Sequence, residues 1–321
     1  MEILHWEQLT SKNKKTLSGT RPILILGPRD ISQARIQQLQ KKISARRTTT
    51  NKLTVVWGCL TDKFIPGLKG SPQFSSLSLK KLTKALNQLS PEQQPSAILV
   101  YPQRYINYII KEIQWSAIIG VNGSWHHAFH YRPEYCEISK KKLTYKLVSS
   151  FVNEVEAKKY EAEIKKKIKL EEFIAQIGQK FSDQELMKLA ERAAQHSFDW
   201  TFQTGAVLAR DRVLLAVAHN RVVPYETFSF HHGASKEKQL APPQDLNYFD
   251  TNHAEVELIL QALEKKIDLA ETSLYINLLP CPICARMLAR SPIGTIVYQH
   301  DHSQGYGFKL LKQAGKKVKR F

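Results

Sequence analysis

The chain has 321 residues, 42% of them hydrophobic, and carries 47 Lys and Arg against 29 Asp and Glu, a net charge of +18. This length predicts two domains with self-sufficient cores, and the composition excludes a disordered tail. The positive charge indicates a polyanionic partner such as nucleic acid or an anionic membrane surface. Four cysteines, no apolar signal core and no run of about 18 uncharged apolar residues predict a cytoplasmic protein that spans no membrane.

The first 150 residues hold most of the excess charge, with 23 Lys and Arg against 8 Asp and Glu. Apolar runs alternate with amphipathic stretches there, which predicts a separate N-terminal α/β domain over 1–150. The predicted strands are 23–26, 53–59, 97–101 and 117–121, and the predicted helices are 30–46, 77–89 and 105–113. Asn122-Gly123 is predicted to form a hairpin turn. No glycine-rich phosphate-binding fingerprint is present, so the domain is expected to be an accessory or nucleic-acid-binding domain.

Two groups of residues in this domain are candidates for nucleic-acid contact. The basic clusters are Arg46, Arg47, Lys80, Lys81, Lys84, Lys140, Lys141 and Lys142. They are candidate phosphate contacts, and the alternative is a solvated surface. His126, His127 and His130 lie beside aromatic residues and are interpreted as a packing or RNA-contact segment, with a second metal site as the alternative.

Residues 151–180 carry 7 Lys against 6 Glu in alternation, which predicts an exposed charged linker helix. Apolar residues are too sparse there for a core-facing surface. A dimerising coiled coil is the alternative, although the heptads are not sustained.

Residues 181–321 are nearly neutral, with 17 Lys and Arg against 15 Asp and Glu. Ser182 and Glu185 predict a capping box at the start of a helix. The predicted elements that follow are a hairpin of strands 205–209 and 213–218, a helix over 253–264, a strand over 273–279, a helix over 281–290, a strand over 295–298, a helix over 307–313 and a strand over 317–321. In the helix over 253–264, the inward residues are expected to be Val256, Ile259, Leu260 and Leu263. The helix between the last two strands predicts that these strands are parallel.

Two motifs in this half are expected to form one metal site. His253 and Glu255 open one predicted helix, and Cys281 and Cys284 open the next, with both thiols on one side of its first turn. One imidazole and two thiolates leave a fourth position for water, which is typical of a catalytic zinc site. Glu255 is the candidate for moving the proton of that water. A zinc knuckle, or a redox cysteine pair with an unrelated histidine, is the alternative.

The order H-x-E followed by P-C-x-x-C resembles the zinc-dependent cytidine and deoxycytidylate deaminase-like superfamily. The resemblance covers 182–321 and implies a three-layer α/β/α fold with a mixed five-stranded sheet, one catalytic Zn²⁺, the metal ligands His253, Cys281 and Cys284, and catalytic Glu255. The helix between the last two strands resembles the branch that contains tRNA adenosine and deoxycytidylate deaminases. The resemblance also implies substrate contacts by Asn220, Ala254 and Pro280. Many relatives carry Glu where this chain has Leu279.

The connection over 224–252 is long and rich in aromatic and histidine residues. Phe228, Phe230 and Tyr248 are candidates for a lid or a base-stacking loop, and a structural insertion is the alternative.

These features predict a deaminase of a nucleobase, with cytosine favoured over adenine. Because the N-terminal domain is basic, a nucleic-acid substrate, RNA or tRNA, is slightly favoured. The first alternative is a free-nucleotide deaminase of deoxycytidylate type with a regulatory or oligomerising N-terminal domain. The second is a catalytically silent zinc-bound nucleic-acid-binding protein. A homo-oligomer is expected in each case.

Overall fold

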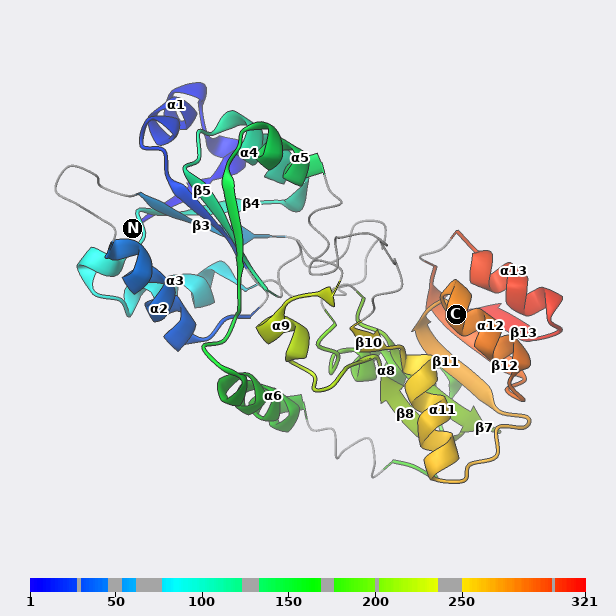
Figure 1. Cartoon of the computed structure of the whole chain (residues 1–321). Coiled ribbons are helices and arrows are strands. Elements are labelled where there is room, and N and C mark those ends of the chain that lie inside the picture. Colours follow the sequence, from blue (N-terminus) through cyan, green and yellow to red (C-terminus); the bar gives the residue numbers. More distant parts are fainter. Residues whose placement is uncertain are drawn as a thin grey trace. The chain divides into compact units, whose positions relative to one another are not determined.

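The computed structural model describes residues 1–27, 30–45, 54–61, 77–122, 133–168, 176–199, 202–235, 250–301 and 304–321 (Figure 1). The chain folds into two compact units. The first unit contains the chain up to Ala157 together with the segment that begins at Phe228, and the second contains Lys158–Thr227 and Asp250–Phe321. None of the helices in the described ranges has the length and apolar character needed to cross a bilayer.

The first unit is built on a six-stranded parallel sheet with the strand order β1-β4-β3-β2-β5-β6. Its strands are β1 Glu2–His5, β2 Ile23–Leu26, β3 Val55–Leu60, β4 Ala97–Tyr101, β5 Ala117–Val121 and β6 Thr144–Val148. Its helices are η1 Trp6–Gln8, α1 Ser11–Gly19, α2 Gln33–Ser44, α3 Leu79–Asn87, η2 Pro91–Gln93, η3 Gln103–Tyr105, α4 Ile106–Glu112, α5 Pro133–Lys140 and α9 Phe228–His232.

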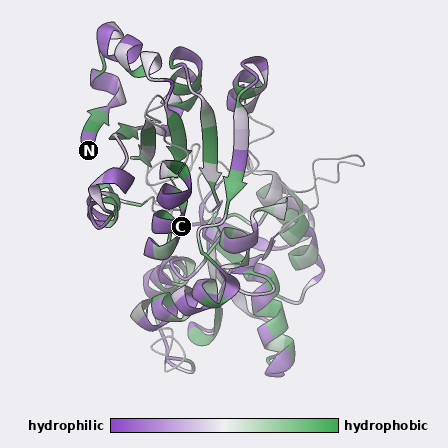
Figure 2. Ribbon diagram, turned by 60° about the vertical axis from the view of Figure 1, so that its left-hand side comes forward, coloured by the Kyte–Doolittle hydropathy of each residue, from purple (hydrophilic) through white to green (hydrophobic). Residues whose placement is uncertain are grey.

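The central strands β2, β3 and β4 are buried along their whole length, as continuous apolar runs in a parallel sheet require (Figure 2). On one face, Ile36 of α2 and Leu82 of α3 pack against Ile25 and Trp57 of the sheet. The α/β expectation for this part of the chain is therefore confirmed.

One prediction for the first unit was wrong. The helix predicted from Asp30 begins at Gln33, because the side chain of Ser32 accepts a hydrogen bond from the Arg35 N–H and caps it. Gly123 of the predicted Asn122-Gly123 turn lies outside the described residues; β6, the next described strand, pairs with β5 in parallel, so these two strands do not form a hairpin. The sequence analysis also missed the outer strands β1 and β6, whose residues are too polar to give an apolar run.

The charged stretch after the first unit contains α6, which covers Glu154–Ile168. Glu161 and Lys165 lie one turn apart on this helix, and their side chains form an ion pair of 2.5 Å. The Glu161 side chain is only 13% exposed and also accepts a hydrogen bond of 3.3 Å from the Thr227 N–H. This side of α6 therefore packs on the chain near Thr227, so the predicted linker helix is not exposed all round.

The second unit contains a mixed five-stranded sheet with the order β13-β12-β11-β7-β8 and a two-stranded antiparallel ribbon of β9 and β10. The strands are β7 Gly205–Arg210, β8 Val213–His219, β9 Arg221–Val222, β10 Thr251–Asn252, β11 Ser273–Leu278, β12 Thr295–His300 and β13 Lys317–Arg320. The helices are α8 Asp183–Ala194, α11 Ala254–Glu264, α12 Pro282–Arg290 and α13 Tyr306–Gln313.

Helices cover both faces of this sheet. Leu186 and Ala190 of α8 pack on one face against Val207. Leu258 of α11 and Leu288 of α12 belong to the core on the other face. The unit is therefore the expected three-layer α/β/α structure. As predicted, Ser182 and Glu185 form a capping box, β7 and β8 form a hairpin, and β12 and β13 are parallel.

Candidate metal centre

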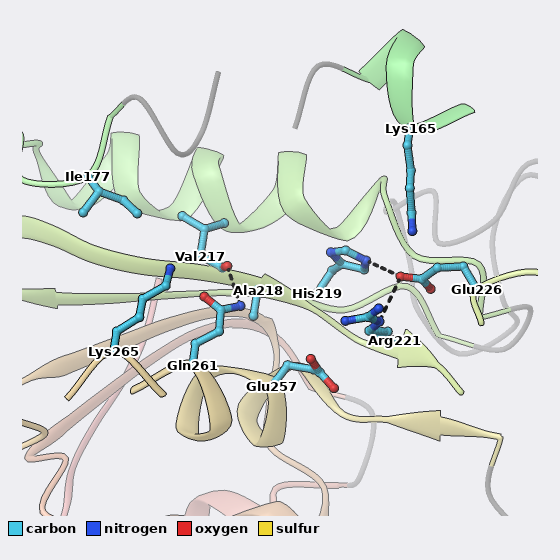
Figure 3. Close-up of a pocket in the computed structure, with 10 residues that line it drawn as sticks. All are labelled: Lys165, Ile177, Val217, Ala218, His219, Arg221, Glu226, Glu257, Gln261 and Lys265. Carbon is cyan, nitrogen blue, oxygen red and sulfur yellow. Dashed lines mark hydrogen bonds and ion pairs between the residues drawn. The ribbon is translucent and has the colours of Figure 1, made fainter. Parts of the chain in front are cut away.

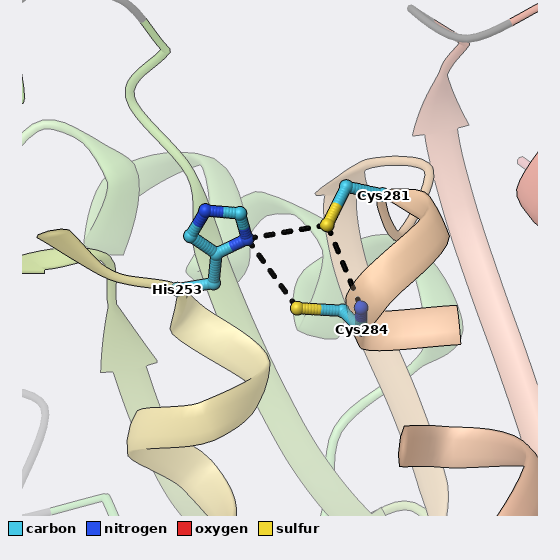
Figure 4. Close-up of side chains that lie close together, drawn as sticks. All are labelled: His253, Cys281 and Cys284. Carbon is cyan, nitrogen blue, oxygen red and sulfur yellow. Dashed lines mark hydrogen bonds between the residues drawn. The ribbon is translucent and has the colours of Figure 1, made fainter. Parts of the chain in front are cut away.

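Three side chains of the second unit converge at one point, as the two motifs predicted (Figure 4). The His253 Nδ1 atom lies 3.4 Å from the Cys281 Sγ atom and 3.3 Å from the Cys284 Sγ atom. All three ligand atoms lie within 4.8 Å of one another. The structure thus brings together a nitrogen and two sulfurs that are far apart in the sequence.

Helix starts place these side chains. His253 is the N-cap residue of α11, and its ring makes no capping hydrogen bond, so it is turned toward the cysteines. Cys281 is the N-cap residue of α12, where its Sγ atom accepts a hydrogen bond of 3.5 Å from the Cys284 N–H. Pro282 occupies the first turn, where its missing N–H leaves no donor unpaired. The partial positive charge of the α12 N-terminus favours thiolate sulfur at this place.

The protonation states of the three groups depend on one another. Hydrogen bonds from Cys284 and His253 lower the pKa of Cys281 to about 3, although burial opposes them. The hydrogen bond to Cys281, together with burial, raises the pKa of the Cys284 thiol. The hydrogen bond with Cys281 raises the pKa of His253 to about 9. Two neighbouring sulfurs can both ionise only beside a positive charge, and a dication in place of these protons supplies it.

The donor set and its spacing fit zinc. Zinc–sulfur bonds of about 2.3 Å and zinc–nitrogen bonds of about 2.05 Å, at tetrahedral angles, place nitrogen and sulfur about 3.5 Å apart. The observed separations of 3.4 and 3.3 Å are close to this value. Three protein ligands leave one tetrahedral position for water or substrate, which distinguishes a catalytic site from a closed structural one.

Glu255 lies beside these ligands in the first turn of α11 and is 3% exposed. Burial raises the pKa of its carboxyl group to about 7, and the charge of His253 opposes this rise. A carboxyl group with a pKa near neutrality can both accept and release a proton, which is the property of a general acid–base catalyst. The structure therefore places the predicted proton carrier next to the predicted metal ligands.

A small cavity of about 70 Å³ opens onto His253, Glu255 and Cys281. Its other walls are Asp199, Phe202, Thr204, Asn220, Leu278 and Leu279. Asn220 lines the cavity, and its side chain accepts a hydrogen bond from the Thr204 N–H and donates one to the Phe202 carbonyl, at 2.8 and 2.7 Å. Ala254 and Pro280 are buried beside the ligands but do not belong to this lining. Substrate contact by these residues remains a prediction.

The sequence analysis missed one wall of the cavity, formed by Asp199, Phe202 and Thr204. Buried amides hold this wall: Asn277 accepts a hydrogen bond from the Gly205 N–H and donates one to the Gln203 carbonyl. Asn277, a polar residue inside an otherwise apolar strand, was the available signal. The Asp199 carboxylate accepts a hydrogen bond of 2.7 Å from the Thr251 hydroxyl. No sequence pattern marked Asp199 as part of the site.

The cavity lining does not include Phe228 or Phe230, two of the candidate lid residues. Phe228 and Phe230 are on α9, which belongs to the first unit, and Phe230 is fully buried there. Tyr248 lies outside the described residues, as do Arg46, Arg47, His126, His127 and His130. Of the other candidate phosphate contacts, Lys141 donates hydrogen bonds to the carbonyl groups of Ile110 and Ile113 and so caps the C-terminal end of α4.

A larger cavity of about 320 Å³ lies elsewhere in the second unit, beside β8 and α11 (Figure 3). None of the three ligands nor Glu255 lines it. Its buried Glu226 shares a hydrogen bond of 3.1 Å with His219 Nε2 and forms an ion pair of 3.8 Å with Arg221. Size alone therefore does not locate the chemistry, which lies where the metal donors and Glu255 meet.

One comparison with known families bears on this site. Residues 180–300 match the model of the family "Cytidine and deoxycytidylate deaminase zinc-binding region". The matched range contains the three candidate metal ligands and Glu255. No curated protein is significantly similar to the chain.

Solved structures of deaminases resemble the second unit only distantly. The apo dCMP deaminase from the cyanophage S-TIM5 is 21% identical over 43% of this chain and 95% of its own, with a TM-score of 0.35. A structure from a study of A-to-I editing by tRNA:A34 deaminases is 21% identical over 43% of this chain and 98% of its own, with a TM-score of 0.30. Likeness at this level does not bear on the substrate.

Proposed function

We propose that this protein replaces the exocyclic amine of a cytosine-type base with oxygen, in a nucleotide or a nucleic acid, with RNA favoured. The observation that carries the proposal is the buried carboxyl of Glu255 beside a three-ligand metal group with a fourth position open. The family matched by residues 180–300 is described for cytidine and deoxycytidylate, which supports a cytosine-type base.

When bound, zinc supplies a Lewis acid that makes water acidic enough to act as a nucleophile near neutral pH. Glu255 accepts one proton of the attacking water and delivers it to the ring nitrogen. The same carboxyl then transfers the second water proton to the departing amine, so that water and the amino base yield the oxo base and ammonia. Phe202, Leu278 and Leu279 supply apolar walls that keep other water away from the base.

Replacement of Glu255 by Gln tests this role. The variant keeps the size and burial of the side chain but cannot carry the proton, so we expect turnover to fall about 10²–10⁴-fold while zinc stays near one per chain. Cytidine, CMP, dCMP, adenosine, guanine and total tRNA serve as substrates, and mass spectrometry detects the gain of 1 Da. A Glu264→Gln variant is the matched control, because Glu264 is exposed at the other end of the same helix and does not line the site cavity. Equal turnover by the Glu255→Gln variant and the wild type would refute the mechanism.

The preference for RNA is supported by a group of lysines that we call the basic surface. It consists of the exposed Lys41 and Lys42 of α2 and Lys80, Lys81 and Lys84 of α3. Both helices cover the same face of the first sheet, and neither contains an acidic residue. Lysines without neighbouring carboxylates favour contact with phosphates.

Charge replacement on this surface tests the preference for RNA. We expect a Lys80→Gln/Lys81→Gln/Lys84→Gln variant to bind RNA more weakly and to lower the slope of log affinity against log salt by about 2, at about 0.7 per lost phosphate contact. The matched control removes the same charge from exposed Lys12, Lys15 and Lys111. If both triple variants weaken RNA binding equally, or if neither weakens it, the basic surface does not bind RNA specifically, and the free-nucleotide alternative is favoured.

The free-nucleotide alternative has its own support, since the matched family is described for both cytidine and deoxycytidylate. In that case dCMP or CMP is converted at the same rate with and without competing RNA. A catalytically silent zinc protein is disfavoured, because that role does not require the buried carboxyl of Glu255.

A further inference from the structure

One segment of the chain joins the two units in an unusual way. The chain leaves the second unit after Thr227 and returns to it at Asp250. Within this excursion, α9 packs as part of the first unit. The first unit therefore holds a piece of the catalytic unit's own sequence.

The place that α9 occupies is the carboxyl edge of the first sheet. All strands of this sheet are parallel. After β2, the chain adds β3 and β4 on one side of β2 and then β5 and β6 on the other side, so the order of the strands reverses between β2 and β5. In open parallel sheets, ligands bind beyond the carboxyl ends of the strands at such a reversal. Asn122 directly follows β5, and Ser149 and Ser150 directly follow β6 at this same edge.

These three residues hold α9 by hydrogen bonds. The Ser150 N–H donates to the Phe230 carbonyl at 3.1 Å, and the Asn122 Nδ2 atom donates to the His231 carbonyl at 3.2 Å. The Ser149 Oγ atom lies 2.8 Å from the His231 Nδ1 atom. The Phe230 side chain is 0% exposed. A ligand position of the fold is thus filled by the chain itself.

The residues that hold α9 are themselves held by hydrogen bonds that do not involve α9. The Ser150 hydroxyl donates to the Asn122 carbonyl, and the Ser150 carbonyl accepts a hydrogen bond of 3.0 Å from the Ser32 N–H at the start of α2. The Ser149 Oγ atom accepts a hydrogen bond of 3.1 Å from the Phe151 N–H. This network fixes the Ser150 N–H, the Asn122 amide and the Ser149 hydroxyl in one arrangement. Because these groups are already ordered, binding α9 costs less conformational entropy.

The other end of the excursion lies at the catalytic site. Strands β9 and β10 pair in an antiparallel ribbon, and the Val223 N–H extends it with a hydrogen bond of 3.0 Å to the Asp250 carbonyl. Asn220 comes immediately before β9, and the metal ligand His253 comes immediately after β10. The ribbon therefore connects the held segment directly to a cavity-lining residue and to a metal ligand.

We propose that the carboxyl edge of the first sheet is a docking site for α9, and that Asn122 and Ser149 are positioning residues for the deaminase site. By holding α9, they fix the β9–β10 ribbon and, through it, the positions of Asn220 and His253. This assigns the first unit a part in substrate binding that does not depend on nucleic acid. Only the kinetic consequence rests on the proposed deaminase function.

The pair Ser149 and His231 allows a double-mutant cycle read by amide hydrogen exchange. In full-length protein, Ser149→Ala and His231→Ala should each speed exchange at least about fivefold over 220–223 and 250–252, because each removes the hydrogen bond that the two side chains share. Ser149→Ala also removes the acceptor of the Phe151 N–H hydrogen bond, and His231→Ala also removes the ring that packs on His232. The double variant should therefore exchange about fivefold more slowly than the product of the two single effects, and Ser149→Thr, which keeps the hydroxyl, should exchange like the wild type. Ser44→Ala is the control, because its hydroxyl donates to the Glu92 carbonyl in the same unit, away from α9.

The same variants separate positioning from folding. We expect KM to rise about threefold or more, with kcat within about twofold and zinc content unchanged. Additive effects in the double variant, or faster exchange over 228–232 with no change over 220–223 and 250–252, would overturn the proposal. If the wild type deaminates none of the tested bases, the proposed function fails, and the exchange result still decides whether α9 docks and positions the ribbon.

Discussion

The two units differ in the kind of polar group that they bury. The second unit buries two carboxyl side chains, Glu226 and Glu255. Within the described ranges, the first unit buries none, and its buried polar side chains are amides and hydroxyls. Burying a carboxylate is costly unless a partner or a reaction uses it. The difference therefore separates a unit that performs chemistry from a unit that holds chain segments in place.

The sheets follow the same division. The parallel sheet of the first unit has helices on both faces, and its excess charge lies outside, on surfaces such as α2 and α3. The mixed sheet of the second unit brings the starts of α11 and α12 together, where the metal ligands lie. A mutation in one unit should therefore lower the stability of that unit and leave the stability of the other unit unchanged.

Two glycines offer the largest test of this separation. A Cβ atom at Gly27 would lie 2.1 Å from the Gly58 carbonyl oxygen in the first unit, and one at Gly205 would lie 2.0 Å from the Ala190 carbonyl oxygen in the second. Because both obstacles are backbone, we expect Gly27→Ala and Gly205→Ala each to lower the free energy of unfolding of its unit by about 3 kcal/mol. In urea, zinc release reports the second unit, and tryptophan fluorescence reports mainly the first, because the buried Trp6, Trp57 and Trp115 of the first unit are three of the five tryptophans in the chain.

Gly19→Ala and Gly294→Ala are the matched controls. No atom lies within 4 Å of a Cβ at Gly19, and the nearest to one at Gly294 is 3.9 Å away, so both should stay within about 0.5 kcal/mol of the wild type. Simultaneous loss of zinc and of tryptophan burial in Gly27→Ala would mean that the two units unfold as one, which contradicts the separation.

The elements that the sequence predicted well have strong local signals. The buried strands β2, β4 and β5 were placed at their observed bounds, because each is a short apolar run between turn residues. The sequence also predicted that His253, Cys281 and Cys284 come together, because they lie at helix starts marked by a proline and by the motif spacing. That they bind a metal stays a prediction.

The inward side of α11 was predicted wrongly. Leu260 and Leu263 were expected to face the core, but they are 48% and 70% exposed, while Ala254, Leu258 and Ala262 are buried. Helix α11 is oriented so that Glu255 is buried beside the candidate metal ligands. The pattern of hydrophobic residues alone does not predict this orientation, because it places a charged residue on the exposed side. The wall at Asp199 and the docking of α9 were missed for a related reason, since both depend on contacts between residues far apart in the sequence.

A buried histidine gives a smaller test, confined to the second unit. His196 is 3% exposed, and its ring stacks on that of His219 with 5.7 Å between ring centres. Burial, followed by the charges of His219, Arg192 and Lys165, lowers the pKa of His196 from 6.5 to about 4. Below pH 6.5 the unfolded chain binds a proton that the folded chain does not, so stability is complete above this pH and is lost toward pH 4.

We expect this histidine to remove about 2 kcal/mol from the free energy of unfolding of the second unit between pH 8 and pH 5. Urea unfolding of His196→Asn alongside the wild type isolates the effect, because titrations shared by both proteins cancel in the difference. The variant should lose less stability on acidification, and the first unit should respond alike in both proteins. Parallel pH profiles for the second unit would show that His196 is protonated in the folded state, and would remove it from the polar groups that distinguish this unit from the first.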